Sequence, residues 1–213
     1  MPCVRRATVA PLASAYAEKM NTAVRELRPH TDDLRHRLRA GTADLHARVD
    51  ACFASGLGTP LAYARYLVGM HRFASDYEIV TGGSPRASCW LAGDLSDLSL
   101  TSLPPAGVRG FATNADTRLG WDYVMAGSSL GARHLLRGVQ ALGHAEQAGA
   151  RFLAHHAKGD AWHSVLERLR ARSMHADPYV HLLQGARDAF LLVQSCFERS
   201  FDAMPVPDEE PAA

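Results

Sequence analysis

Apolar residues recur three, four and seven positions apart along most of this chain, which is the spacing of one face of an α-helix. From Thr31 to Phe53, leucine, valine and phenylalanine follow this spacing, and Thr31 is placed to cap the helix. No segment sustains an alternation of apolar and polar residues, and no Asn-Gly or Asp-Gly pair marks a hairpin. The pattern therefore predicts an all-α fold of about seven or eight helices.

Helix N-termini are indicated by three pairs in which a capping residue precedes proline, because proline suits the first helical position. These pairs are Thr59-Pro60, Ser84-Pro85 and Asp177-Pro178. A long helix is predicted from about Asn114 to Leu142, and the segment LPPAGVRG is predicted to be a loop. The last three helices are predicted over about 146–157, 161–173 and 178–204.

The composition is that of one globular domain. Hydrophobic residues make up 47% of the 213 positions and the formal charge is +1, so no strong field favours nucleic acid or an anionic membrane. No apolar run approaches the roughly 20 residues that span a bilayer, and the four cysteines form no CxxC pair. We expect a cytoplasmic protein that binds neither nucleic acid nor membrane. Its parts are an extension over 1–30, a helical domain over 31–204 and a disordered acidic, proline-rich tail over 205–213.

Two glycines lie inside the long predicted helix. Gly127 and Gly131 are one turn apart on the same face, and each costs about 1 kcal/mol relative to alanine. Such a pair can let a neighbouring helix pack closely, or it can let a flat ligand lie against bare backbone. In the second case Ser128 and Ser129 would supply hydroxyl groups, and the helix could kink between them. The spacing alone leaves both interpretations open.

His46 borders the apolar stripe of the first predicted helix, and Asp50 follows one turn later. A histidine in this position is usually an amphipathic or hydrogen-bonded residue, but it can also bind a metal ion. Asp50 could orient the imidazole through its other nitrogen, as carboxylates do at metal sites. His155 and His156, in contrast, are adjacent and point in different directions on a helix, so we expect them to be surface or packing residues.

These segments together resemble the bacterial, biliverdin-producing haem oxygenases. The first helix, with its leucines, Thr42 and His46, is similar to the family's proximal helix. The stretch YVMAGSSLGA is similar to the distal helix, which reads tyrosine, valine, any residue, glutamate, glycine, serine, any residue, leucine, glycine. The stretch ARDAFLLVQSCFERSF resembles the last core helix. The resemblance covers roughly residues 32–201 in the family's order, and it implies a single-domain helical bundle that binds haem.

The resemblance also implies roles for single residues. His46 matches the iron ligand, and Gly127, Ser128 and Gly131 match the catalytic distal set whose backbone lies against the macrocycle. The expected cofactor-binding residues are Arg39, Thr42, Asp50, Tyr123, Phe190, Arg168 and Arg172. Of these, Asp50 matches the acidic residue that engages the ligand histidine, and Arg39 matches a basic position that pairs with one haem propionate. We interpret Arg168 and Arg172 as the residues that hold the second propionate, although such pairs commonly form a solvated face.

The family converts haem, dioxygen and electrons to biliverdin, carbon monoxide and iron, so haem is both cofactor and substrate. We therefore expect an enzyme whose electrons come from an external donor of the ferredoxin or flavoprotein reductase type. The product would supply a bacteriophytochrome, or the reaction would release iron from scavenged haem. The sequence departs from the family at Ala126, where glutamate is common, so an interaction that braces the distal helix would be missing.

Alternatives remain open at this stage. A non-catalytic haem carrier or sensor would use the same fold, and a helical interaction module would use Gly127 and Gly131 for packing only. A carboxylate-bridged di-iron site is disfavoured, because none of the glutamates has a histidine three residues later.

Overall fold

The computed structural model describes residues 29–108, 112, 114–172 and 178–205, and every regular element in these ranges is a helix. The same ranges contain no strand, only isolated bridges from Ala145 to Ala148 and Gly149. The all-α prediction is therefore confirmed. The helices are α2 (Pro29–Gly41), α3 (Ala43–Cys52), α4 (Pro60–Thr81), α5 (Arg86–Asp97), α6 (Ala115–Gly127), α7 (Ser129–Ala141), α8 (Arg151–Lys158), α9 (Ala161–Arg172) and α10 (Tyr179–Ala203).

The described ranges thus hold nine helices, or seven when α2–α3 and α6–α7 are each counted as one interrupted helix. Residues 1–28 and 206–213, which contain nearly all of the expected extension and tail, lie outside the described residues. Across the ranges described, none of the helices combines the length with the hydrophobicity that a bilayer-spanning segment requires.

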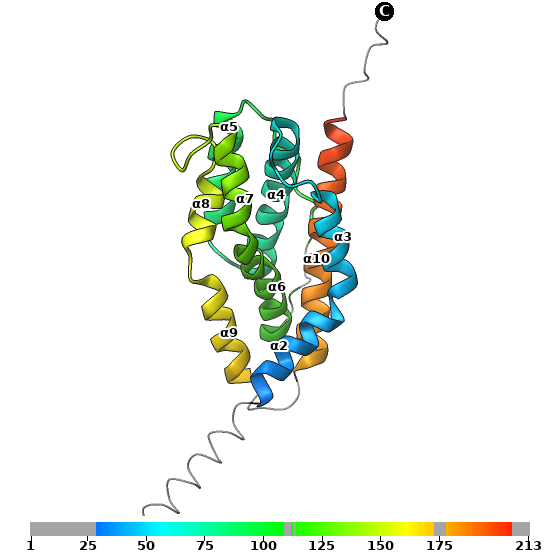
Figure 1. Ribbon diagram of the computed structural model, residues 1–213. Coiled ribbons are helices and arrows are strands. Elements are labelled where there is room, and N and C mark those ends of the chain that lie inside the picture. Colours follow the sequence, from blue (N-terminus) through cyan, green and yellow to red (C-terminus); the bar gives the residue numbers. More distant parts are fainter. Residues whose placement is uncertain (1–28, 109–111, 113, 173–177, 206–213) are drawn as a thin grey trace, which may run out of the picture.

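Helix α10 runs along one side of the bundle (Figure 1). It packs against α6 and α4, and it also contacts α2 and α3. Helices α8 and α9 lie on the other side of the α6–α7 segment, with α9 against α6 and α8 against α7 (Figure 1). Helix α5 connects the two sides by packing against both α4 and α8. The core between them includes the fully buried side chains of Trp121, Tyr63, Phe73 and Phe152.

The crossing of α6 and α10 depends on two glycines. A Cβ atom added at Gly120 would overlap the backbone carbonyl oxygen of Leu182, and one added at Gly185 would overlap that of Thr117. Both obstacles are backbone atoms, which cannot turn aside as the end of a flexible side chain can. The two helices therefore pack backbone against backbone, and this contact fixes the position of α6.

Two helical segments that line the cavity described below, α2–α3 and α6–α7, are each interrupted. The first breaks at Thr42, whose hydroxyl donates to the carbonyl oxygen of Leu38 at 2.8 Å. The Thr42 carbonyl accepts from the His46 N–H at 2.9 Å, which begins α3. The second breaks at Ser128, between the end of α6 and the start of α7. This break lies at the position where the glycine-serine segment predicted a kink.

Two of the expected helix starts are confirmed. Thr59 caps α4 by accepting from the Ala62 N–H at 3.2 Å. Asn114 caps α6 by accepting from the N–H groups of Asp116 and Thr117 at 3.0 and 2.8 Å. The expected loop is also confirmed over residues 103–108, whereas residues 109 and 110 and the expected cap at Asp177 lie outside the described residues.

Two expected N-caps are wrong. Helix α2 begins at Pro29, so Thr31 lies inside the helix instead of capping it. Ser84 does not cap α5, because the Glu78 carboxylate of α4 accepts from the first N–H groups of α5, at Ala87 and Ser88. A carboxylate from a neighbouring helix has replaced the local cap.

The helix expected from about residue 146 begins instead at Arg151. The Asp94 carboxylate of α5 accepts from the N–H groups of Arg151 and Phe152 at 2.8 and 2.9 Å, which fixes this helix start. Gly149, two residues earlier, has a φ of +79°, a conformation that favours glycine. The turn before α8 therefore occupies residues that the periodicity assigned to the helix.

Candidate functional site

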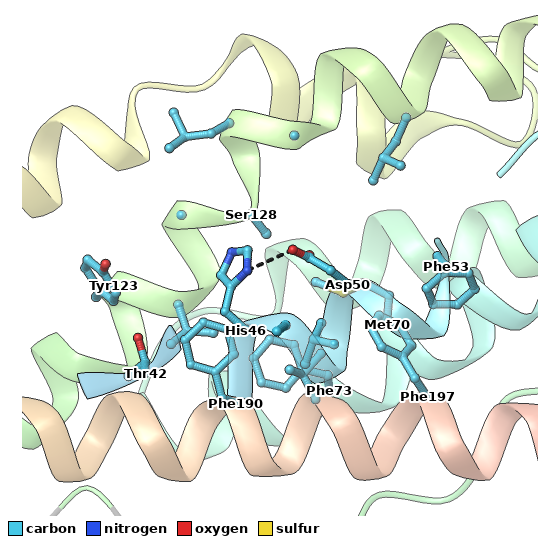
Figure 2. Close-up of a pocket in the computed structure, with 18 of the residues that line it drawn as sticks. Thr42, His46, Asp50, Phe53, Met70, Phe73, Tyr123, Ser128, Phe190 and Phe197 are labelled. Carbon is cyan, nitrogen blue, oxygen red and sulfur yellow. Dashed lines mark ion pairs between the residues drawn. The ribbon is translucent and has the colours of Figure 1, made fainter. Parts of the chain in front are cut away.

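A cavity of about 810 Å³ lies between the α2–α3 segment and the α6–α7 segment, with α4 and α10 completing its wall. This volume falls in the range of roughly 300–1,000 Å³ that is typical of ligand pockets. Figure 2 shows its side chains, with His46 and Asp50 from α3, Ser128 from the α6–α7 break and Phe190 from α10. Nine of the eleven expected site residues line this cavity. They are Arg39, Thr42, His46, Asp50, Tyr123, Gly127, Ser128, Gly131 and Phe190.

His46 lines this cavity beside Asp50 and Phe190 (Figure 2). Its Nδ1 lies 2.9 Å from Oδ2 of Asp50, and its ring meets Phe190 edge-on, with centroids 5.6 Å apart. When Nδ1 carries the proton that Asp50 accepts, Nε2 keeps a lone pair that can bind a metal ion. The His46 side chain is 61% exposed, so a molecule entering the cavity can reach it.

Gly127 and Gly131 are not explained by helix packing. A Cβ at Gly131 would meet nothing within 4 Å, and one at Gly127 would meet only the Trp162 ring at an ordinary 3.6 Å. Close packing would instead produce the backbone overlaps found at Gly120. This observation favours the second interpretation of the pair, in which open space is kept along the cavity wall.

The two serine hydroxyls at the break are turned toward the backbone of α6. Ser128 Oγ donates to the carbonyl oxygen of Met125 at 2.8 Å, and Ser129 Oγ donates to that of Ala126 at 2.6 Å. Both carbonyls belong to the last turn of α6, next to the break. The serines therefore brace the break beside Ala126.

One end of the cavity is cationic. Arg35 and Arg39, one turn apart on α2, both line it together with Tyr123 and Trp162. Burial raises the pKa of the Tyr123 hydroxyl, whereas the guanidinium groups of Arg35 and Arg39 act to lower it. This end is suited to a carboxylate group, since two guanidinium groups and a phenol can all donate hydrogen bonds.

Much of the remaining wall is apolar. Phe53, Phe73 and Phe197 line it, and Phe53 meets Phe197 edge-on, with ring centroids 4.9 Å apart. Phe53, Phe73 and Phe197 are labelled in Figure 2 on the Asp50 side of His46, away from Tyr123. An amphipathic ligand would therefore direct its acidic groups to the arginine end and its apolar body to the phenylalanine end.

Arg168 and Arg172 are the two expected residues that the structure does not bring to the cavity. Nη1 of Arg168 lies 2.5 Å from Oδ2 of Asp122, and Nε of Arg172 lies 3.0 Å from Oδ1 of Asp116. Both acidic partners belong to α6 and neither lines the cavity. These arginines tie α9 to α6, so Arg35 takes their place as the second cation at the cavity.

Several residues at or beside the cavity wall were not expected from the sequence, among them Arg35, Trp162 and His156. Arg35 could have been found, because it lies one turn before Arg39 on the same helix. Trp162 carries no sequence signal that separates it from a core residue. His156 was assigned to packing, yet its Nε2 lies 2.8 Å from Ser128 Oγ.

No protein-family model and no curated protein matches this chain at a significant level. A solved structure is similar, that of the NO- and CO-bound heme oxygenase from Neisseria meningitidis. The two superpose with a TM-score of 0.59 over 84% of this chain and 98% of that chain, at 24% sequence identity. At this identity the likeness concerns the fold rather than the activity. The chain therefore has a heme-oxygenase-like, all-helical fold.

Proposed function

We propose that this chain is a haem oxygenase, which binds one haem in the cavity and cleaves it to biliverdin, carbon monoxide and ferrous iron. The observation that carries the proposal is the cavity itself, in which His46 lies on one wall and the glycine-flanked break at Ser128 on another. The fold supports the proposal independently, because it is similar to that of a heme oxygenase.

The residues present fit a haem in size and chemistry. Haem has a flat apolar ring, two propionates on one edge and a metal ion at its centre. The cavity offers matching groups, with phenylalanines at one end, Tyr123 at the other and His46 between them (Figure 2). Arg35 and Arg39 also line the cavity, and their guanidinium groups act on the pKa of Tyr123. In this proposal Arg35 and Arg39 hold the propionates.

His46 would bind the iron through Nε2, while Asp50 holds its ring orientation and its tautomer from the Nδ1 side. When bound, haem supplies both the iron that activates dioxygen and the carbon that is oxidised. Gly127 and Gly131 keep side chains away from the facing wall, so that the ligand can approach the backbone. Ser128 supplies a hydroxyl at that wall.

The other partners in this proposal are dioxygen and an external electron donor of the ferredoxin or flavoprotein reductase type. A bacteriophytochrome that takes up biliverdin is the proposed recipient of the product. Neither Arg168 nor Arg172 has a role in it, because each is paired with an aspartate of α6.

A hemin titration of the full chain tests the binding step. We expect a Soret band at micromolar hemin and its loss or displacement in His46→Ala, because the variant lacks the iron ligand. His163→Ala is the matched control. The His163 side chain is about as exposed as that of His46, at 69%, and it too pairs with a carboxylate one turn later, that of Glu167. Asp50→Asn should weaken hemin binding roughly ten- to hundredfold. A His46→Ala complex with an unchanged Soret band contradicts the ligand role.

Turnover then separates an enzyme from a haem carrier. The hemin complex is mixed with an electron donor in air, and the appearance of biliverdin absorption is followed. Biliverdin formation supports the proposal, whereas a stable haem spectrum identifies a carrier or sensor. Failure of the unaltered chain to bind hemin would leave a helical module whose cavity takes some other molecule.

A further inference from the structure

The His156 side chain of α8 reaches the break between α6 and α7. Nε2 of His156 lies 2.8 Å from Ser128 Oγ, and the same hydroxyl donates to the Met125 carbonyl oxygen at 2.8 Å. The His156 ring stacks on Phe152, with centroids 4.9 Å apart and planes inclined by 20°. Ser128 lines the cavity, so His156 contacts it from behind the wall.

The hydrogen bonds at Ser128 have a direction. Burial lowers the pKa of His156 to about 4, while a hydrogen bond to the Met125 backbone acts to raise it, so the ring is neutral near pH 7 and has one N–H. The Ser128 hydroxyl has one proton, which it gives to Met125. With this proton on Met125, Ser128 Oγ accepts from His156, and this arrangement has the ring proton on Nε2.

The position of His156 is itself well fixed. Phe152, on which it stacks, is fully buried, and the Asp94 carboxylate holds the N–H groups that begin α8. Near the other end of α8, Arg133 of α7 donates to the Ala157 carbonyl oxygen at 3.3 Å. Because these contacts hold the ring in place, the position of its Nε2 atom is set before any ligand binds.

We infer that His156 is a positioning residue for Ser128: its Nε2–H holds the serine oxygen at the cavity wall, which leaves the hydroxyl proton free to turn from Met125 to a bound ligand. The inference rests on the proposed function for the identity of that ligand. Without His156, the oxygen would lose its donor, and the hydroxyl would keep its proton on the Met125 carbonyl or change rotamer. Ser128 would then be a weaker donor to the cavity.

The ligand-free full chain tests the hydrogen-bond direction. We expect ¹⁵N NMR of the His156 imidazole to show the proton on Nε2 and to show that this proton exchanges more slowly than in Ser128→Ala. Protonation on Nδ1 overturns the inference, because Nε2 would then accept the Ser128 proton. This measurement needs no haem and is independent of the proposed function.

The hemin-loaded chain tests the consequence. Carbon monoxide is added to the reduced complex, and its C–O stretching frequency is measured, since a hydrogen-bond donor near the ligand lowers that frequency. His156→Phe keeps the ring stack but removes the N–H, so we expect a higher frequency, as in Ser128→Ala. His156→Gln restores an N–H and should return the frequency part of the way. The double variant should shift no further than Ser128→Ala alone, because both changes remove one interaction.

The outcomes separate the two hypotheses. An unchanged frequency in His156→Phe, no recovery in His156→Gln, or summed shifts in the double variant overturns the positioning role while hemin binding stands. If the unaltered chain fails to bind hemin, the proposed function is wrong and the role in haem binding falls with it, whatever the tautomer of His156.

Discussion

Helix α6 carries one glycine near its middle and another at its end, and the surroundings of the two differ. Gly120 faces the backbone of α10, where an added Cβ would overlap the Leu182 carbonyl oxygen. Gly127, with Gly131 on α7, faces the cavity, where an added Cβ meets at most an ordinary contact with Trp162. Gly120 lets two helices touch, whereas Gly127 and Gly131 leave part of the cavity wall without side chains.

The comparison separates two uses of the same residue type within one helical segment. Glycine in a helix costs about 1 kcal/mol wherever it stands, so the cost itself carries no information on its purpose. What differs is the atom that a side chain would meet. At the crossing the cost is offset by packing, whereas at the cavity no close contact within the protein offsets it; in the proposed function a bound ligand does.

The largest expected effect is at the crossing. Gly120→Ala forces a methyl group into backbone, so the free energy of unfolding should fall by about 3 kcal/mol, or the chain should fail to accumulate as a folded protein. Gly185→Ala should do the same, because its Cβ would overlap the Thr117 carbonyl oxygen from the other side. Urea unfolding followed by circular dichroism measures both. A variant as stable as the unaltered chain would show that α6 and α10 can separate without cost.

An intermediate effect is expected behind the cavity wall, at His156. The pKa of His156 is about 4 in the folded chain and near 6.5 in the unfolded chain. Between these pH values the imidazole binds a proton mainly in the unfolded state. Stability should therefore fall as the pH is lowered from 6.5 to 4, by about 2 kcal/mol after allowance for partial exposure.

The His156→Phe variant isolates this contribution. All other histidines are shared with the unaltered chain, so the difference between the two stability curves belongs to residue 156. We expect the variant to lose less stability on acidification, measured by urea unfolding at several pH values. Parallel curves would mean that His156 titrates alike in both states.

The helices were predictable because they follow from local periodicity, whereas the site residues were expected mainly from the resemblance to haem oxygenases. His46, Asp50, Gly127 and Gly131 have spacings that place them on defined helix faces, and the structure brings all four to one cavity. The start of α8 was not predictable in this way. Its cap is Asp94, which lies 57 residues earlier in the chain, and a sequence pattern does not show such a pairing.

The charged residues show the same limit. Arg168 and Arg172 have the spacing of a ligand-binding pair, yet each is paired with an aspartate of α6. His156 was judged only as a partner for His155 in chelation, whereas its contact comes from Ser128, 28 residues earlier. Long side chains reach partners on several neighbouring elements, so tertiary packing decides which partner each one meets.

The smallest effect on stability is expected at Gly131, and its sign is opposite to that at Gly120. Gly131→Ala adds a methyl group to open space on a helix, so the free energy of unfolding should rise by about 1 kcal/mol through helix propensity alone. The same methyl group points into the space that the proposed ligand uses, so hemin binding should weaken while the fold becomes more stable.

Gly138→Ala is the matched control, because Gly138 lies on the same helix outside the cavity and its Cβ would meet nothing closer than 3.9 Å. It should raise stability by a similar amount and leave hemin binding unchanged. Equal hemin affinities for the two alanine variants would mean that the bare wall at Gly131 serves no ligand, and the contrast with Gly120 would lose its functional meaning.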